Sequence, residues 1–295
     1  MYNYTKYNTE SEDIYSNMAE ILKGAPVAAA LTEKLIARSQ ALKVKPMLAI
    51  LRVGNKPDDI SYETGIIKRC EKIGIEVKKI ILPEDCEGRE VIESVKSLNN
   101  DKAIHGVLIF RPLSDKATEQ EASKILSPAK DVDCMTQESL ASVFTGSKAG
   151  YPPCTAQACI ELMDHYGIEL EGKNIVVIGR SLVIGKPLSI MLQNRNATVT
   201  MCHSKTRELP EICKRAEIIV AAIGKAGFVD SSFVAPGQVV IDVGINLDAN
   251  GKLCGDVKFD EVEPIVKAIT PVPAGVGSVT TSVLAKHVIE ACEQC

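Results

Sequence analysis

The feature that most constrains the fold is a regular alternation of short apolar runs with segments of helical periodicity. In the first half of the chain, apolar runs at 47–53, 77–82 and 106–110 alternate with helix-like segments at 58–73, 87–98 and 118–126. This rhythm is typical of a parallel sheet whose strands are joined by crossover helices. We therefore predict an α/β fold for this half.

The second half of the chain repeats the pattern. A β-branched run at 174–178 is followed by a glycine turn and a helix that opens at Pro187, and further buried strands are expected at 198–202, 218–223 and 239–243. The halves meet near 151–155, ahead of a linking helix at 156–166. We expect two α/β domains. The first spans 1–155 and is completed by a C-terminal helix at 280–295, and a Rossmann-like dinucleotide-binding domain spans 156–279.

Composition excludes several classes of protein. With 295 residues, 45% of them hydrophobic, the chain is long enough for two packed domains. The net charge is -4 and Lys and Arg form no long run, so no nucleic acid partner is expected. Residues 1–16 are polar and no apolar stretch of about 18 residues follows, so we expect no membrane association and a cytoplasmic location. Ten scattered cysteines without C-x-x-C spacing indicate reduced thiols, and no metal is expected.

The turn after the 174–178 run carries the first chemical signal. It reads Gly179-Arg180-Ser181-Leu182-Val183-Ile184-Gly185-Lys186-Pro187. Glycines let the backbone approach a phosphate, and a helix N-terminus supplies N–H donors and partial positive charge, so a pyrophosphate fits there. The spacing departs from G-x-G-x-x-G, and such a turn is also common as a purely structural element, so the next strand must decide between the two interpretations.

The end of the next strand favours NADP over NAD. An acidic residue there would accept the ribose hydroxyl of NAD, whereas cationic and hydroxyl side chains suit the additional phosphate of NADP. The chain has Cys202-His203-Ser204-Lys205-Thr206-Arg207 and no carboxylate. Arg180 and Ser204 together can share one phosphate, whereas Lys205 and Arg207 taken singly are better interpreted as solvated loop residues.

Several segments, in order along the chain, resemble those of one family. They are Lys130-Asp131-Val132-Asp133, Pro153-Cys154-Thr155, the 179–187 turn, and residues 197–204, 240–246, 255–257 and 269–273. Together they closely resemble the methylenetetrahydrofolate dehydrogenase/cyclohydrolase family, with matching segments from about Leu48 to Val283. Residues 1–16 extend beyond the family's usual start.

This resemblance implies a folate cleft between the two domains, a tetrahydrofolate derivative as substrate, and a homodimer. The family's dehydrogenase oxidises methylenetetrahydrofolate by hydride transfer to the nicotinamide, and its cyclohydrolase adds water to the methenyl product to give formyltetrahydrofolate. Hydride transfer needs mainly the orientation of two rings, whereas hydrolysis needs a charged or proton-transferring group beside the reacting carbon.

The resemblance also assigns roles to individual residues. Tyr62 and Asp133 fall on catalytic positions, where the tyrosine ring lies against the pterin and the carboxylate receives the donor edge of the pterin. The implied substrate-binding positions are Tyr62, Asp133, Pro273, Gly275 and Gly277, and the implied cofactor-binding positions are Gly179, Arg180, Ser181, Gly185, His203, Ser204 and Ile245.

Two catalytic positions of the family are altered. Ile66, one helical turn after Tyr62, stands where the family has lysine, and Phe110 stands where the family has the glutamine that pairs with that lysine. Lys68 lies about 200° further round the helix and should face away. Because apolar residues replace both polar partners, no buried polar group is left unsatisfied, which indicates a coherent redesign of the site. Further departures are Asp59 for a usual serine and Cys134 and Ala274 for usual glycines.

Four functional hypotheses follow. We favour an NADP-dependent dehydrogenase whose cyclohydrolase activity is lost or very weak. The alternatives are a bifunctional enzyme with an unrecognised proton donor, a non-catalytic folate-binding protein, and another two-domain NADP enzyme such as one acting on shikimate. The retained cofactor motifs argue against a non-catalytic protein, and the Lys-Asp-Val-Asp and Thr-Pro-Val-Pro segments argue against a different enzyme.

Overall fold

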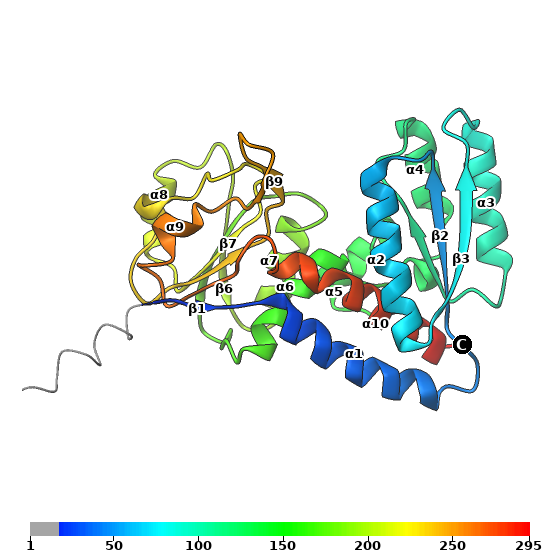
Figure 1. The fold of residues 1–295 in the computed structure, drawn as a ribbon, viewed down its shortest axis with the longest axis horizontal. Helices are drawn as coiled ribbons and strands as arrows, with labels where there is room; N and C mark the ends of the chain where they lie inside the picture. The colour runs from blue at the N-terminus through cyan, green and yellow to red at the C-terminus, as the bar shows by residue number, and fades with distance from the viewer. Residues whose placement is uncertain (1–17) are drawn as a thin grey trace, which may run out of the picture.

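The computed structural model describes residues 18–295 and shows two α/β lobes side by side (Figure 1). The first lobe contains a three-stranded parallel sheet with the strand order β3-β2-β4. Its strands are β2 (Met47–Val53), β3 (Glu76–Leu82) and β4 (Gly106–Ile109). The helical segments of this half are α1 (Gly24–Ala41), α2 (Pro57–Ile73), α3 (Gly88–Asn100), α4 (Lys116–Ile125), the 3-10 turn η2 (Pro128–Lys130) and α5 (Gln137–Thr145).

The apolar pattern predicts these elements because their apolar residues are the buried ones. The central strand β2 has five consecutive buried residues, as expected for a strand that is covered on both faces. Helix α2 begins at Pro57, whose fixed φ suits a first turn, and ends at Gly74, whose left-handed conformation (φ 91°) closes the helix. Predicted and observed bounds differ by about one or two residues.

The second lobe is built on a six-stranded parallel sheet with the strand order β1-β11-β8-β7-β5-β6. Its strands are β1 (Glu20–Ile21), β5 (Asn174–Ile178), β6 (Thr198–Cys202), β7 (Ile218–Ala221), β8 (Val239–Asp242) and β11 (Ala268–Ile269), and a separate hairpin pairs β9 (Asn246–Leu247) with β10 (Leu253–Cys254). The helical segments of this half are α6 (Cys154–His165), α7 (Gly185–Gln193), α8 (Leu209–Lys214), η3 (Ser231–Phe233), α9 (Phe259–Val262), η4 (Val276–Ser278) and α10 (Thr280–Glu293).

The strand order of the second lobe places a topological switch point at β5. The chain runs from β5 outward to β6, then crosses back over β5 to β7 on its other side. Parallel sheets bind ligands in the crevice that opens at such a point, outside the carboxyl ends of the strands. The 179–187 turn follows β5 directly, so it lies where a dinucleotide would bind.

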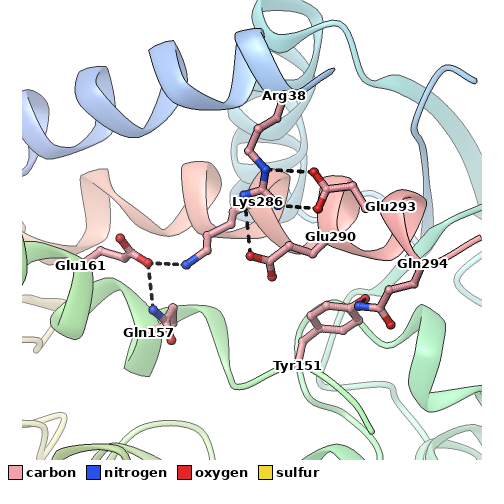
Figure 2. Close-up of polar contacts among 8 residues, drawn as sticks. All are labelled: Arg38, Tyr151, Gln157, Glu161, Lys286, Glu290, Glu293 and Gln294. Atoms are coloured by element: carbon pink, nitrogen blue, oxygen red, sulfur yellow. Dashed lines mark hydrogen bonds and ion pairs between the residues drawn. The ribbon is translucent and has the colours of Figure 1, made fainter. Parts of the chain in front are cut away.

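Helix α10 returns the chain from the second lobe to the first, where it packs against α1, α2 and β4 (Figure 1). Charged side chains hold it there (Figure 2). Arg38 of α1 pairs with Glu293 at 2.6 Å, and Lys286 pairs with Glu161 of α6 at 2.6 Å. Gln157 donates to the same Glu161 carboxylate at 2.8 Å. Helices α1, α6 and α10 are therefore fixed relative to one another between the lobes.

The sequence analysis assigns no element to α1, α5 or β1. Helix α1 is rich in alanine, which occurs on both the buried and the exposed faces of a helix. The periodic alternation of apolar and polar residues that predicts a helix is therefore weak here. Strand β1 has two residues, too few for a pattern, yet it pairs with β11 and so attaches residues 20–21 to the sheet of the second lobe. None of the helices between residues 18 and 295 is long and apolar enough to cross a membrane.

Candidate active site

The two glycines of the 179–187 turn allow close packing. A Cβ atom on Gly179 (φ 141°) would clash with the carbonyl oxygen of Ala222 at the end of β7, and a Cβ atom on Gly185 would clash with the carbonyl oxygen of Gly179. The turn therefore folds tightly over the switch point. The Ile184 N–H donates to Oγ of Ser181 at 3.1 Å, which closes the turn, and α7 begins at Gly185, two residues before the predicted start at Pro187.

A cavity of about 510 Å³ opens beside this turn. It is bounded by the residues that follow β5, β6 and β7, as a switch-point crevice should be. Five of the predicted cofactor-binding residues line it, namely Gly179, Arg180, Ser181, His203 and Ser204, together with Leu209, Ala222, Ile223, Lys225 and Phe228. Gly185 is buried beneath the turn, and Ile245 lines a separate cavity.

The polar groups of this cavity fit a phosphorylated cofactor. Arg180 and Ser204 are exposed. The Lys205 N–H donates to Nδ1 of His203 at 3.1 Å, so the neutral imidazole carries its proton on Nε2 and can donate from there. The guanidinium of Arg180, the imidazole of His203 and the hydroxyls of Ser181 and Ser204 line this cavity. No carboxylate is among its lining residues in the described part of the chain. This donor set suits the 2′-phosphate of NADP better than the free ribose hydroxyl of NAD.

Two buried aspartates hold the loops around the cavity, and the sequence analysis gives them no role. Asp256, 0% exposed, accepts from the N–H groups of Ile223 (2.6 Å), Gly224 (3.0 Å) and Lys225 (2.8 Å), and from the Asn246 amide at 2.9 Å. These bonds tie the loop after β7 to the start of the hairpin. In the sequence, Asp256 belongs to the 255–257 motif that resembles the family. The motif alone does not reveal that this carboxylate holds the loop after β7.

Asp242 also holds nearby loops together through its buried carboxylate. Its carboxylate accepts from the N–H groups of Gly244 (2.9 Å), Asp256 (3.0 Å) and Val257 (2.9 Å). Burial raises the pKa of Asp242 to about 6, although the three N–H donors oppose that shift. The two carboxylates together join β8, the hairpin and the cofactor cavity.

We expect Asp256→Asn to weaken NADP binding about tenfold without altering folate binding, because the amide presents N–H groups to backbone donors and loosens the 223–225 loop. Titration calorimetry with each ligand measures this. Asp230→Asn is the matched control, since Asp230 caps η3 in the same lobe by accepting from the Ser232 N–H. Equal losses of NADP and folate affinity would show that Asp256 acts on the whole fold.

A second cavity, of about 220 Å³, lies at the carboxyl ends of β8 and β11. Its lining includes Ile245 and the predicted substrate-binding residues Pro273, Gly275 and Gly277. Ile245 is 68% exposed although it is apolar. The loop that carries the three substrate-binding residues continues directly into Thr280 at the start of α10. This cavity therefore brings Ile245, a predicted cofactor-binding residue, together with three predicted substrate-binding residues.

On the first-lobe side, each residue of the Lys-Asp-Val-Asp motif has a distinct task. The Lys130 ammonium donates to the carbonyls of Leu98, Asn99 and Asp101 and so caps the C-terminus of α3. Asp131 accepts from the N–H groups of Met135 (2.8 Å) and Thr136 (2.7 Å) and shapes the following turn. The carbonyl of Val132 lies 2.9 Å from Nδ1 of His287 on α10. The Asp133 side chain is the partly exposed carboxylate of this motif, at 34%.

Asp133 is held at the N-terminus of α6. Its Oδ1 atom accepts from the Cys154 N–H at 3.2 Å, and its Oδ2 atom lies 3.9 Å from Nη2 of Arg111. Burial raises the pKa of Asp133, while the bonds with Cys154 and the charge of Arg111 lower it. The neighbouring Cys134 adopts a left-handed conformation (φ 58°), which turns the chain away directly after Asp133. A carboxylate supported in this way can accept paired N–H groups from a ligand.

Tyr62 of α2 lies near Asp133 and is 42% exposed. Its ring centroid is 5.7 Å from that of Phe110, with the planes tilted by 60°. Burial of the hydroxyl raises the pKa of Tyr62 above its usual range, and the negative charge of Asp133 adds to the shift. The phenol therefore keeps its proton at neutral pH and can donate a hydrogen bond.

Ile66 and Phe110 belong to the hydrophobic core beneath Tyr62. Ile66 is 1% exposed and Phe110 is 8% exposed, and both lie in the same apolar cluster. Lys68 is exposed, in agreement with the expectation that it faces away. Neither apolar side chain can donate, accept or ionise next to Tyr62.

Comparison with known proteins identifies the family. The tetrahydrofolate dehydrogenase/cyclohydrolase catalytic-domain model matches residues 22–133, and the NAD(P)-binding-domain model of the same family matches residues 153–295. The bifunctional protein FolD of Clostridium botulinum (strain 657 / Type Ba4) is 52% identical over 280 residues, which cover 94% of this chain and 99% of that protein.

Solved structures give the same result. The bifunctional enzyme FolD from Campylobacter jejuni has a TM-score of 0.89 and 35% identity, covering 94% of this chain and 99% of that one. The methylenetetrahydrofolate dehydrogenase-cyclohydrolase of Trypanosoma brucei, complexed with NADP and an inhibitor, has a TM-score of 0.87 and 30% identity, covering 94% and 98%. The chain, an enzyme with an NAD(P)-binding Rossmann-like domain, therefore belongs to the tetrahydrofolate dehydrogenase/cyclohydrolase family.

Proposed function

We propose that this protein is an NADP-dependent methylenetetrahydrofolate dehydrogenase of one-carbon metabolism whose cyclohydrolase activity is lost or very weak. One observation carries the proposal: the chain has a cofactor cavity at the switch point, whereas Ile66 and Phe110, next to Tyr62, are apolar and buried. Family membership supports the dehydrogenase reaction. It argues against the non-catalytic and shikimate alternatives.

In this proposal the protein binds and orients the reactants. NADP supplies the hydride acceptor. Asp133 accepts N–H groups from the pterin, the Tyr62 ring lies against the pterin, and the 273–278 loop closes the cleft beside Ile245. Arg180, Ser181, His203 and Ser204 hold the phosphates at the switch point. Ring orientation of this kind is what hydride transfer requires of the protein.

The loss of hydrolysis is inferred from chemistry. Adding water to the methenyl carbon needs a side chain that moves a proton or stabilises charge beside it, a contribution of about 100-fold to 10,000-fold in typical enzymes. The family resemblance implies that Ile66 and Phe110 stand at the family's lysine and glutamine positions, and both side chains are buried. The alternative is a bifunctional enzyme that also produces formyltetrahydrofolate, and it would need another group in the cleft.

The dehydrogenase is tested by mixing the protein with methylenetetrahydrofolate and either NADP or NAD. We expect reduced cofactor and methenyltetrahydrofolate to form in equal amounts, faster with NADP. Absence of turnover with both cofactors in a folded protein would contradict the proposal.

Arg180→Ala should weaken NADP binding about tenfold or more while changing NAD binding much less, because only NADP presents the phosphate to the guanidinium. Dissociation constants for both cofactors measure this difference. Arg207→Ala is the matched control, because Arg207 is exposed in the same region without lining the cavity. Equal losses for the two cofactors would show that the phosphate site is placed wrongly.

We also propose a homodimer, which the family resemblance implies. Phe144 of α5 is 73% exposed and Leu182 is 57% exposed, and both line a small apolar hollow between α5 and α7. Adjacent exposed apolar side chains are typical of an interface. Sedimentation should give the mass of two chains, and Phe144→Asp should shift the protein toward the mass of one. A monomeric unmodified protein would contradict the proposal.

A further inference from the structure

A positive charge lies beside Asp133 at a position to which the sequence analysis assigns no role. Phe110 and Arg111 are the first two residues after β4. The Nη2 atom of Arg111 is 3.9 Å from Oδ2 of Asp133. The two side chains are 28% and 34% exposed, so both lie at the surface of the cleft. A cation here stands close to the group that would receive the pterin.

The segment that carries Arg111 is anchored on both sides. The Phe110 N–H donates to the Leu51 carbonyl of β2 at 2.9 Å, and the Leu113 N–H donates to the Glu119 carboxylate of α4 at 2.8 Å. Phe110 and Leu113 are each 8% exposed. Phe110 and Leu113, on either side of Arg111 along the chain, are buried and hydrogen-bonded. The backbone therefore keeps the Arg111 side chain directed toward Asp133.

Most of the donor capacity of Arg111 is unused. A guanidinium carries five N–H donors in a planar fork. Within residues 18–295, the contact with Asp133 is the one polar contact of this side chain. The other N–H groups are therefore available to a ligand that binds at Asp133.

We propose that Arg111 is a substrate-recognition residue that forms, with Asp133, a donor–acceptor pair for one edge of the pterin. That edge of a pterin presents N–H groups beside a carbonyl oxygen, the 4-oxo group. Asp133 accepts from the N–H groups, and Arg111 donates to the 4-oxo oxygen. The inference rests on the proposed folate function and adds to it the atom that discriminates between substrates.

Arg111 also affects the ionisation of Asp133. Burial raises the pKa of that carboxyl, and the charge of Arg111 lowers it. The other titratable groups facing the carboxyl are Cys154 from α6, Tyr62 from α2, and Asp131 and Cys134 from its own loop. None of these carries a positive charge. Without Arg111 the pKa of Asp133 should rise, and the carboxyl should lose its acceptor role at a higher pH.

Calorimetric titration with folic acid and with aminopterin tests the proposal, because these compounds differ in carrying a 4-oxo or a 4-amino group. The unmodified protein should prefer folic acid at least about tenfold, and Arg111→Leu should reduce that preference several-fold. Part of the preference should remain, because aminopterin also lacks the N3 hydrogen that Asp133 accepts. The pH at which half of the folic acid affinity is lost should also move to a higher pH in Arg111→Leu, because the carboxyl loses the neighbouring positive charge. Arg111→Lys should keep the acid midpoint near its original value while losing part of the preference, since an ammonium keeps the charge but not the fork.

Arg195→Leu is the matched control, because Arg195 forms an exposed ion pair with Asp164 at 2.7 Å after the end of α7. It should leave both the preference and the acid midpoint unchanged. Unchanged preference and an unchanged midpoint in a folded Arg111→Leu protein would overturn the role of Arg111. Failure of the unmodified protein to bind either compound would instead overturn the proposed folate function.

Discussion

A protein carrying both Ile66→Lys and Phe110→Gln should hydrolyse methenyltetrahydrofolate about 100-fold faster than the unmodified protein, the lower end of the range for general acid–base catalysis. The lysine would supply the missing charge one turn after Tyr62, and the glutamine would supply the hydrogen-bond partner that a buried ammonium requires. Decay of the methenyl absorbance measures the rate.

Each single change should do much less. Ile66 is 1% exposed, so a lysine there beside Phe110 would be desolvated, and its pKa would fall toward the neutral form. Thr64→Lys is a control that adds the same charge on an exposed position of α2. A double variant that keeps dehydrogenase activity and yet shows no hydrolysis above background would contradict the role assigned to this pair.

Asp133→Ala should raise the dissociation constant for folate at least tenfold, because charge-assisted hydrogen bonds contribute about 1.5–3 kcal/mol. The same carboxyl makes binding pH-dependent. Burial raises the pKa of Asp133, so the acceptor form is lost as the pH falls through a value above that of a free aspartate, and affinity should decrease in that direction. Calorimetric titration of folic acid across pH measures both effects.

Asp164→Ala is the control for Asp133→Ala, because it removes an exposed carboxylate that pairs with Arg195 on the surface. Its folate affinity should match that of the unmodified protein at every pH. An Asp133→Ala protein that is folded, binds NADP normally and keeps its folate affinity would place Asp133 among the residues that only shape the loop.

The sequence was sufficient to predict the elements whose burial repeats along the chain. Strand β2 and strand β5 stand out because both faces of each are covered, so the apolar run is continuous. The edge strand β1 could not be predicted, because its two residues join β11 from the other end of the chain. Pairing between distant short segments leaves no local pattern.

Some residues of the candidate site could likewise be predicted from the sequence, and others could not. Arg180 and Ser204 could be predicted because the residues that follow neighbouring parallel strands meet at one edge of the sheet. The role of Asp256 could not, since it depends on three backbone N–H groups more than thirty residues away. Arg111 was missed for a related reason: its partner Asp133 comes from a separate loop, and only the fold brings the two charges to 3.9 Å.

The most direct test of the central claim uses the unmodified protein. Methylenetetrahydrofolate and NADP are mixed with it, and the methenyl product is followed by its absorbance after the dehydrogenase reaction is complete. We predict that the product accumulates and then decays at the rate seen in the same buffer without enzyme. Decay that is clearly faster with enzyme, and proportional to its concentration, would show that the protein is bifunctional and that Ile66 and Phe110 do not abolish hydrolysis. The search for the group that replaces the lysine would then turn to Asp59, Tyr62 and Cys134.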